Sequence, residues 1–367
     1  MQPRLARDRV GGVPIEVACD ESGYEGEKLI GSLTDVFAHG SVLMDEAAAA
    51  WCVAELRARI RSPATEYKAN HLQREKHRPV LEWFLGPSAP VLGRSRVYLV
   101  DKGYFVLVRL TDVLLGESDA ALTLYRAVRQ ASDPAPWQAF LAAANGLLRV
   151  KNGPAEPIGV FVDALDALPV AAGPLVRALR EARPRAEAYR RGLPAALPGL
   201  DLLFPAIARA VDAVGAAAVT AGPGGVTAGP VAVTVVHDRQ KTLSRERVAV
   251  LTARLGGRLG ELRLVGSERE PRVQLADIVA GTVRKIAEDE LAGRGDPALT
   301  ALLRPYVDPL SVWGDERSWA RLAPATAPFG AWARDPWWAG GSADASPGAP
   351  PPAPPAAPAA VRPSPGR

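Results

Sequence analysis

In the N-terminal third of the chain, apolar residues occur in short runs and in alternation with polar ones, as is typical of strands. Three such segments cover residues 15–19, 29–33 and 36–44. Asp45 then stands at a candidate helix N-cap, and the alanine-rich sequence that follows predicts a helix to about Ile60. This part of the chain therefore predicts strands that lead into a helix.

A further β-rich run covers residues 97–110, either as one strand interrupted near Gly103 or as two short strands. From about residue 118 to 215 the apolar residues instead recur at helical spacing. Residues 172–190 are one of the helices expected there, and this helix is rich in arginine. Strand-like and helix-like segments thus follow one another along the chain, which predicts an α/β fold.

The C-terminal part resumes with a strand at residues 231–236, which ends in His237-Asp238. An amphipathic helix carrying Val248, Leu251 and Leu255 follows, and a last helix is expected from Pro271 to about Leu291. From Ser342 onward the chain is rich in Pro, Ala, Gly and Ser, so residues 340–367 are expected to form a disordered tail. Before the tail, a tryptophan cluster is expected to pack on the fold: Trp332, Trp337 and Trp338.

Composition narrows the class of protein. Hydrophobic residues make up 48% of the 367 residues, enough for a sizeable core, and the formal charge of +4 is compatible with a polyanionic partner without requiring one. Two cysteines, Cys19 and Cys52, are too few for a disulfide framework or a cysteine-based zinc site. Neither a signal peptide nor an apolar run of about 20 residues is evident, so a cytoplasmic protein without a membrane partner is expected.

Two acidic residues stand where apolar residues are expected. Asp20 directly follows the strand at residues 15–19, and Asp277 lies within the apolar stretch of the last helix. A carboxylate near a core is costly unless a cation, a hydrogen-bond network or a metal neutralises it. Gln274 and Gly281 lie on the same helical face as Asp277. Gln274 would orient a neighbouring side chain or backbone group, and Gly281 would allow another backbone to approach this face closely.

Three further acids join these two as candidates. Glu66 comes just after the first helix, Asp101 ends the sequence Val97-Tyr-Leu-Val-Asp101, and Asp238 ends the strand at 231–236. Acids thus follow three candidate strands, at the carboxyl ends where open α/β sheets place their sites. If these strands are parallel neighbours, the carboxylates converge, and an all-oxygen ligand set favours Mg²⁺ or Mn²⁺. Lys68, close to Glu66, would meet a phosphate.

Four short motifs resemble the family called "domain of unknown function 3800". They are Asp20-Glu-Ser-Gly23, Glu66-Tyr-Lys68, His237-Asp-Arg-Gln240 and Gln274-Leu-Ala-Asp277, in family order over roughly residues 13–290. The resemblance implies a ribonuclease H-like fold, in a family often found in bacterial mobile or defence contexts. It also implies a metal site formed by Asp20, Glu66 and Asp277.

The resemblance leaves the remaining strand acid open. A ribonuclease H-like order favours Asp101 on the fourth strand, whereas the His-Asp motif favours Asp238 on the next strand, and the cleaner pattern of that strand also favours Asp238. The expected architecture is one ribonuclease H-like domain over residues 10–335, a mixed sheet flanked by helices, with a helical insertion at 118–215. That insertion departs from a minimal domain of this class and would cover the site or bind substrate.

The expected activity is metal-dependent phosphodiester hydrolysis of RNA or DNA, with two ions activating a water and stabilising the leaving oxygen. Its residues are Asp20, Glu66, Asp277, Asp238 or Asp101, and Lys68. Arginines at 177–191 form either a solvated face with partners such as Glu187 or a phosphate-contacting patch.

Three rival functions remain. In a serine hydrolase, Ser22 would be the nucleophile and His237 the base, although no Gly-x-Ser-x-Gly elbow is present. A zinc hydrolase would need a His-Glu-x-x-His motif or a cysteine pair as ligands, and the chain has neither. In a catalytically silent module that binds nucleic acid or a partner, Asp238 and Asp277 would be structural caps or ion-pair members.

Overall fold

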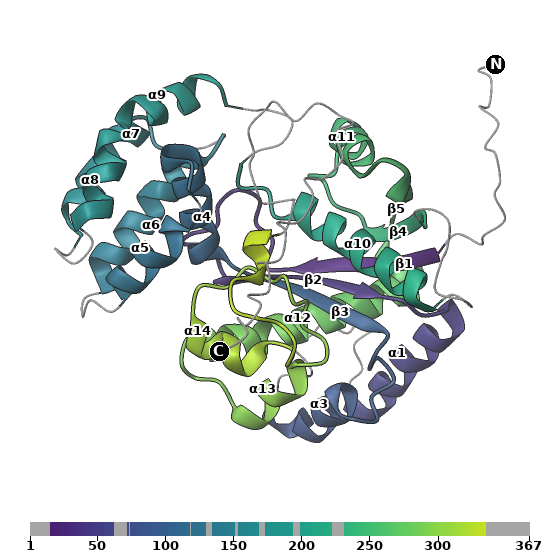
Figure 1. Ribbon diagram of the computed structural model, residues 1–367. Coiled ribbons are helices and arrows are strands. Elements are labelled where there is room, and N and C mark those ends of the chain that lie inside the picture. The colour runs from purple at the N-terminus through teal and green to yellow at the C-terminus, as the bar shows by residue number, and fades with distance from the viewer. Residues whose placement is uncertain are drawn as a thin grey trace, which may run out of the picture.

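The computed structural model describes residues 15–61, 72, 74–117, 119–129, 134–150, 153–168, 173–193, 199–221 and 231–334. It is an α/β structure built on a five-stranded mixed sheet with the strand order β3-β2-β1-β4-β5 (Figure 1). The strands are β1 (Ile15–Ser22), β2 (Val36–Val42), β3 (Ser95–Asp101), β4 (Val233–Asp238) and β5 (Leu259–Val265).

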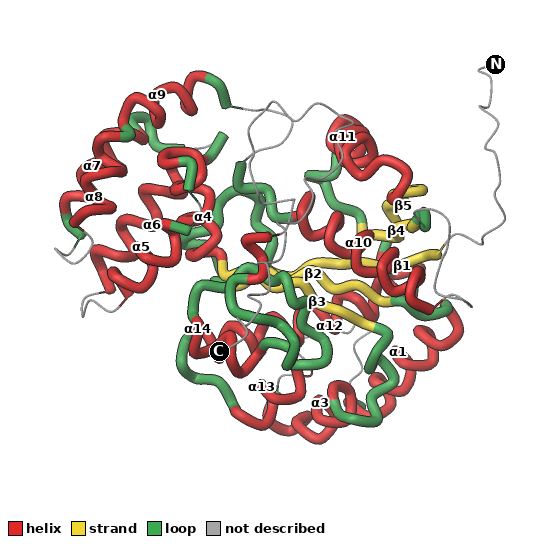
Figure 2. Tube along the Cα trace, viewed as in Figure 1, coloured by secondary structure: helices red, strands yellow, loops and turns green. Residues whose placement is uncertain are grey.

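The C-terminal ends of β1, β3, β4 and β5 lie along the same edge of the sheet, because these four strands run in the same direction. β2 runs antiparallel to both β1 and β3, whereas β4 runs parallel to β1 and to β5. Figure 2 shows these strands in yellow among the helices in red. The strands β1, β3 and β4 therefore all end at this edge, and each ends in or next to an acidic residue. The outer edge of β3 is covered by the segment Tyr306–Val312, whose backbone hydrogen-bonds to Val97, Leu99 and Asp101.

Helices cover both faces of the sheet (Figure 1). On one face, α12 (Pro271–Leu291) crosses β1 and β2 and packs against α1 (Glu46–Ile60). The helices α3 (Arg78–Leu85), α13 (Pro297–Leu303) and α14 (Glu316–Leu322) extend the core on this side. On the other face lie α10 (Leu203–Ala221) and α11 (Arg245–Leu255), which pack on the inner strands through Val17, Cys19, Val233 and Val235.

A helical region packs beside the sheet and shares a core with α4 (Lys102–Leu115) (Figure 1). Its members are α5 (Ala120–Arg129), α6 (Pro134–Leu148), α7 (Pro157–Asp166), α8 (Gly173–Glu181) and α9 (Arg183–Arg191). The single helix expected at 172–190 is thus two helices. The last helix of the 118–215 segment, α10, packs on the sheet itself through residues such as Ile207 and Val211.

The predicted strand at residues 29–33 is wrong. This segment forms a turn between β1 and β2, with Gly31 at φ 65°. The backbone amides of Leu29 and Ile30 are bonded by the side-chain oxygen of Asn145 at 3.1 and 3.2 Å, so they take no part in a sheet. Consequently β4, the strand that ends in Asp238, is the fourth strand in chain order.

The β-rich run at 97–110 is also partly wrong, because the strand ends at Asp101 and α4 begins at Lys102. The side chain of Asp101 caps this helix by accepting a hydrogen bond from the Tyr104 amide at 3.1 Å. Since α4 is packed on most sides, its sequence is apolar throughout and resembles a buried strand. The helix capped by Asp45 is confirmed, with a hydrogen bond to the Ala48 amide at 2.8 Å.

The sequence interpretation missed β5, although Leu262 and Leu264 alternate there with Glu261 and Arg263. Of the tryptophans expected to close the fold, Trp332 is buried against Tyr104, with ring centroids 5.5 Å apart. Trp337, Trp338 and the tail at 340–367 lie outside the described residues. None of the helices in the described part of the chain is long and apolar enough to cross a membrane.

Candidate acidic site at the strand ends

Asp20 lies near the end of β1 and faces α12. Side chains alternate between the faces of a strand, so Ala18 and Asp20 share one face while Cys19 and Glu21 share the other. Ala18 packs with Val273 of α12, which identifies the face of Asp20. Only 6% of Asp20 is exposed. The chain thus places a carboxylate between the sheet and a helix.

Gly40 of β2 allows α12 to approach Asp20 closely. It is the cross-strand partner of Asp20, and a Cβ atom at this position would lie 2.7 Å from the carbonyl oxygen of Ala276. The same Cβ would lie 3.1 Å from the Cβ of Ala280. Because the next residue of α12 is Asp277, the missing side chain of Gly40 brings that acid toward Asp20. The glycine singled out from the sequence, Gly281, is instead a buried residue within α12.

Burial and neighbouring acids together disfavour the charged form of Asp20. Burial contributes most, followed by the negative charges of Glu21, Asp277 and Asp238, and together they raise the pKa of Asp20 to about 9. The Glu21 amide, which donates to Asp20 Oδ1 at 2.7 Å, works in the opposite direction. Acids from β1, β4 and α12 therefore come close enough for their charges to act on one another.

Asp238 is connected to α12 through the preceding turn. Its Oδ1 accepts a hydrogen bond from the Ser267 amide at 3.1 Å, and the carbonyl oxygen of Ser267 accepts one from Gln274 Nε2 at 2.8 Å. Gln274 therefore orients a neighbour, as its position before Asp277 suggested. These contacts fix the start of α12 relative to the end of β4, which sets the positions of Asp238 and Asp277.

Asp101 does not join this group. It ends β3, which is separated from β1 by β2, and the residue of β3 level with Asp20 is Val97. The backbones of Asp20 and Asp101 are therefore at least about 10 Å apart across the sheet. The carboxylate of Asp101 also accepts hydrogen bonds from the Tyr104 amide and from the Tyr125 hydroxyl, the latter at 3.2 Å. Its described contacts are those of a helix cap.

The other two predicted site residues, Glu66 and Lys68, lie outside the described residues. Within the part of the chain that is described, no group of three or more His, Cys, Asp or Glu side chains is arranged to hold a metal ion. The three aspartates are nevertheless oxygen donors of the kind that Mg²⁺ and Mn²⁺ prefer. A divalent cation would also relieve the repulsion that Asp238 and Asp277 exert on Asp20.

A second polar cluster, which the sequence interpretation did not identify as a unit, lies on the opposite face of the sheet. Glu21 receives a hydrogen bond from Gln240 Nε2, and its other carboxylate oxygen lies 3.7 Å from His237 Nε2. His237 Nε2 is also 3.2 Å from His39 Nε2. Desolvation by burial lowers the pKa of both histidines. The Asp20-Glu21 and His237-Asp238 dipeptides, read with strand alternation, could have revealed this cluster.

Ser22 faces α12 together with Asp20. Its hydroxyl accepts a hydrogen bond from Arg284 Nε at 2.9 Å, and Arg284 forms an ion pair with Glu288 at 2.8 Å. Because Ser22 and His237 lie on opposite faces of the sheet, they do not form the nucleophile and base of a serine hydrolase.

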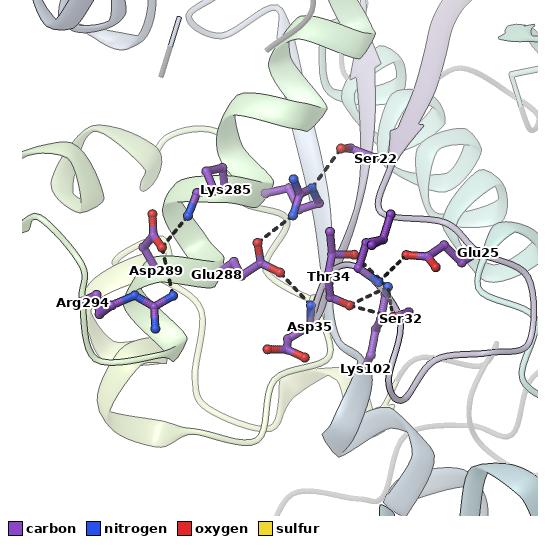
Figure 3. A network of polar contacts seen from close by, with 12 residues as sticks. Ser22, Glu25, Ser32, Thr34, Asp35, Lys102, Lys285, Glu288, Asp289 and Arg294 are labelled. Atoms are coloured by element: carbon purple, nitrogen blue, oxygen red, sulfur yellow. Dashed lines mark hydrogen bonds and ion pairs between the residues drawn. The ribbon is translucent and has the colours of Figure 1, made fainter. Parts of the chain in front are cut away.

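The turn between β1 and β2 is held from both sides (Figure 3). Glu288 of α12 accepts a hydrogen bond from the Asp35 amide at 2.6 Å. From α4, the buried ammonium of Lys102 donates to Ser32 Oγ at 3.0 Å and to the Thr34 carbonyl at 2.8 Å. The turn next to Asp20 is therefore fixed by contacts to both helices.

Several arginines of α8 and α9 have partners within the protein. Arg180 forms an ion pair with Asp166, and Arg183 forms one with Glu187 at 3.2 Å. Arg185 Nη1 donates to the Leu114 carbonyl at 2.9 Å, close to the C-terminus of α4. These contacts favour the interpretation of this segment as a solvated face with local partners.

Comparison of the chain with protein-family models, with curated proteins and with solved structures gives no match.

Proposed function

We propose that this protein is a divalent-metal-dependent nuclease with a ribonuclease H-like fold. The supporting observation is that Asp20, Asp238 and Asp277, from β1, β4 and α12, form one electrostatic group at a sheet edge. Such a group of acids is suited to bind Mg²⁺ or Mn²⁺, with Glu66 as a further ligand and Lys68 as a phosphate contact. Bound ions would supply an activated water and stabilise the leaving oxygen of a phosphodiester.

The order of strands supports Asp238 over Asp101 as the strand acid. A ribonuclease H-like order favours an acid on the fourth strand, and β4 ends in Asp238. The His-Asp motif favours the same residue. Asp101 is occupied as the N-cap of α4. Both arguments from the sequence therefore converge on Asp238 once the turn at residues 29–33 is excluded as a strand.

The test is cleavage of labelled single-stranded RNA, single-stranded DNA and an RNA–DNA hybrid by the full chain. We expect cleavage with Mg²⁺ or Mn²⁺, its loss in EDTA and its return when metal is restored. Asp20→Asn should abolish cleavage while the circular dichroism spectrum stays unchanged. Asp163→Asn, which changes an exposed aspartate of α7, serves as a matched control and should remain active. Metal-independent cleavage, or full activity of Asp20→Asn, contradicts the proposal.

A catalytically silent binding module is the second candidate, because Asp238 already has a structural role in bonding the Ser267 amide. On this alternative the acids hold the strand ends to α12 and no bond is cleaved. Nucleic-acid affinity would then persist in EDTA and in Asp20→Asn, whereas no metal would produce cleavage.

A further inference from the structure

Two dipeptides at neighbouring strand ends have the same layout. In Asp20-Glu21 of β1 and His237-Asp238 of β4, the aspartate faces α12 and its neighbour faces the α10 side. The two strands are parallel and paired, with Cys19 level with His237. Glu21 and His237, the neighbours of the two aspartates, therefore also lie close to each other on the α10 side of the sheet.

The negative charges of the two aspartates repel each other. Contacts on the opposite face of the sheet hold the two strand ends together. Asp238 is among the charges that act on Asp20. On the far face, Gln240 Nε2 donates to Glu21 Oε1, which joins the end of β1 to the residues that follow β4. Glu21 Oε2 lies 3.7 Å from His237 Nε2 and, among the described residues, has no hydrogen-bond partner.

The same contacts reach the backbone of the acids. His237 Nδ1 lies 2.9 Å from the carbonyl oxygen of Asp238, and the Glu21 amide donates to Asp20 Oδ1 at 2.7 Å. His237 is fully buried and only 6% of the Glu21 side chain is exposed, so solvent weakens these contacts little. Because Gln240 follows Asp238 by two residues, a movement of Glu21 relative to Gln240 displaces Asp20 relative to Asp238.

We propose that Glu21 and Gln240 form a clasp that holds Asp20 and Asp238 at the separation required to share a divalent cation. Both are positioning residues, since Gln240 bonds Glu21, and Glu21 acts on Asp20 through its amide and through its negative charge. This inference rests on the proposed function, because it assigns the clasp to that metal site. Outer partners of this kind commonly change metal affinity by about 10- to 100-fold when they are replaced.

The experiment measures Mn²⁺ binding to the full chain, with Mn²⁺ alone as the probe and electron paramagnetic resonance of free Mn²⁺ as the readout. Glu21→Ala removes the clasp, and Gln240→Glu places two carboxylates against each other. We expect each to raise the Mn²⁺ dissociation constant by about 10-fold or more. Glu21→Gln keeps an acceptor for Gln240 and should lose less Mn²⁺ affinity than Glu21→Ala does.

The double variant Glu21→Gln/Gln240→Glu reverses donor and acceptor and should recover the affinity lost in Gln240→Glu. Glu16→Gln is the matched control, because Glu16 pairs with Arg263 and Arg272 at the other end of β1. Circular dichroism and thermal unfolding establish that each variant is folded. If Glu21→Ala does not fold, Gln240→Glu and the double variant still test the pairing.

The outcomes separate the clasp from the proposed function. Unchanged Mn²⁺ affinity in Glu21→Ala and Gln240→Glu, beside a wild type that binds, overturns the clasp alone. Failure of the double variant to recover overturns the pairing of Glu21 with Gln240. A wild type that binds no Mn²⁺ overturns both the proposed function and the clasp. Activity provides a second readout: the Mg²⁺ concentration for half-maximal cleavage should rise, while KM for the oligonucleotide stays constant.

Discussion

Asp20 and Asp101 are two acids at the same edge of one sheet, buried to almost the same degree, with 6% and 4% exposed. Their surroundings differ. Asp101 accepts hydrogen bonds from the Tyr104 amide and the Tyr125 hydroxyl, which are the contacts of a stabilising cap. Asp20 has the Glu21 amide but also three acidic neighbours, which raise its pKa together with burial. Burial alone therefore does not distinguish these two acids, whereas the charge of their neighbours does.

Replacing each acid by its amide gives the largest expected difference. Asp20→Asn should abolish Mn²⁺ binding and raise the melting temperature of the metal-free protein, because the cost of burying an acid beside three others is removed while an acceptor for the Glu21 amide remains. Asp101→Asn should leave Mn²⁺ binding unchanged and lower the free energy of unfolding by about 1 kcal/mol, because the Tyr125 contact loses its charged acceptor. Calorimetry and Mn²⁺ titration measure both. Equal effects of the two substitutions would contradict the distinction between these acids.

The same comparison predicts how stability depends on pH. The pKa of Asp20 rises on folding from an ordinary value of 3.8 to about 9, so the folded state favours the protonated acid. Its contribution is most favourable below about pH 4 and is lost as pH rises toward 9. The free energy of unfolding of the metal-free wild type, minus that of metal-free Asp20→Asn, should therefore decline between pH 5 and pH 8. The decline should be on the order of 1 kcal/mol or more.

Mn²⁺ should reverse this trend, because it binds the ionised carboxylates and competes with protons. The rise in melting temperature caused by saturating Mn²⁺ should be larger at pH 8 than at pH 6. In Asp101→Asn, the Mn²⁺-induced rise in melting temperature should depend on pH as it does in the wild type, since Asp101 lies apart from Asp20, Asp238 and Asp277. A Mn²⁺ shift that is independent of pH would contradict the acidic site.

Gly40→Ala tests whether the approach of α12 places Asp277 beside Asp20. The new Cβ would lie 2.7 Å from the Ala276 carbonyl, which is backbone, so the helix must shift. We expect a loss of about 1–3 kcal/mol in unfolding free energy and weaker Mn²⁺ binding. Gly159→Ala in α7 is the control for introducing a methyl group, since no atom lies within 4 Å of its Cβ and its backbone is helical. Normal Mn²⁺ affinity in Gly40→Ala would contradict this role for the glycine.

The sequence predicts the candidate acids better than their surroundings. Asp20 and Asp238 follow apolar strand segments, and Asp277 interrupts an apolar helix, so each is visible as an exception to a local pattern. The pattern does not separate Asp101 from them, because its role depends on Tyr104 and Tyr125 of the following helices. Gly40 was missed for the same reason, since its close contact comes from a helix far along the chain.

The fold follows the same division between local and distant causes. The helix from Pro271 to Leu291 agrees with its prediction, and the strand predicted at 231–236 is observed at Val233–Asp238, because both segments have a strong local pattern. Residues 29–33 alternate like a strand, but Asn145 bonds their amides and Lys102 holds the adjoining residues. The helix α4 looks like a strand because its surroundings are apolar on most sides. In both cases tertiary contacts override the local pattern.

Lys102 provides the smallest expected effect and tests whether the turn next to Asp20 contributes to the site. Burial is the main cause that lowers the pKa of Lys102 to about 8, while the ammonium still donates to Ser32 and Thr34. Its cost to folding is present below pH 8 and disappears as pH rises toward the ordinary value of 10.5. Lys102→Met removes both this cost and the hydrogen bonds, so the free energy of unfolding at pH 7 should change by less than about 1 kcal/mol.

The loss of these hydrogen bonds should instead be visible as faster hydrogen exchange in residues 32–35. Mn²⁺ affinity should stay within about twofold of the wild type, because Lys102 belongs to α4 and its contacts end at the turn. Arg284→Met is the matched change from the α12 side, since Arg284 bonds Ser22, two residues after Asp20. If Lys102→Met weakens Mn²⁺ binding as strongly as Gly40→Ala does, the site depends on the whole edge of the sheet rather than on the two strand ends and α12.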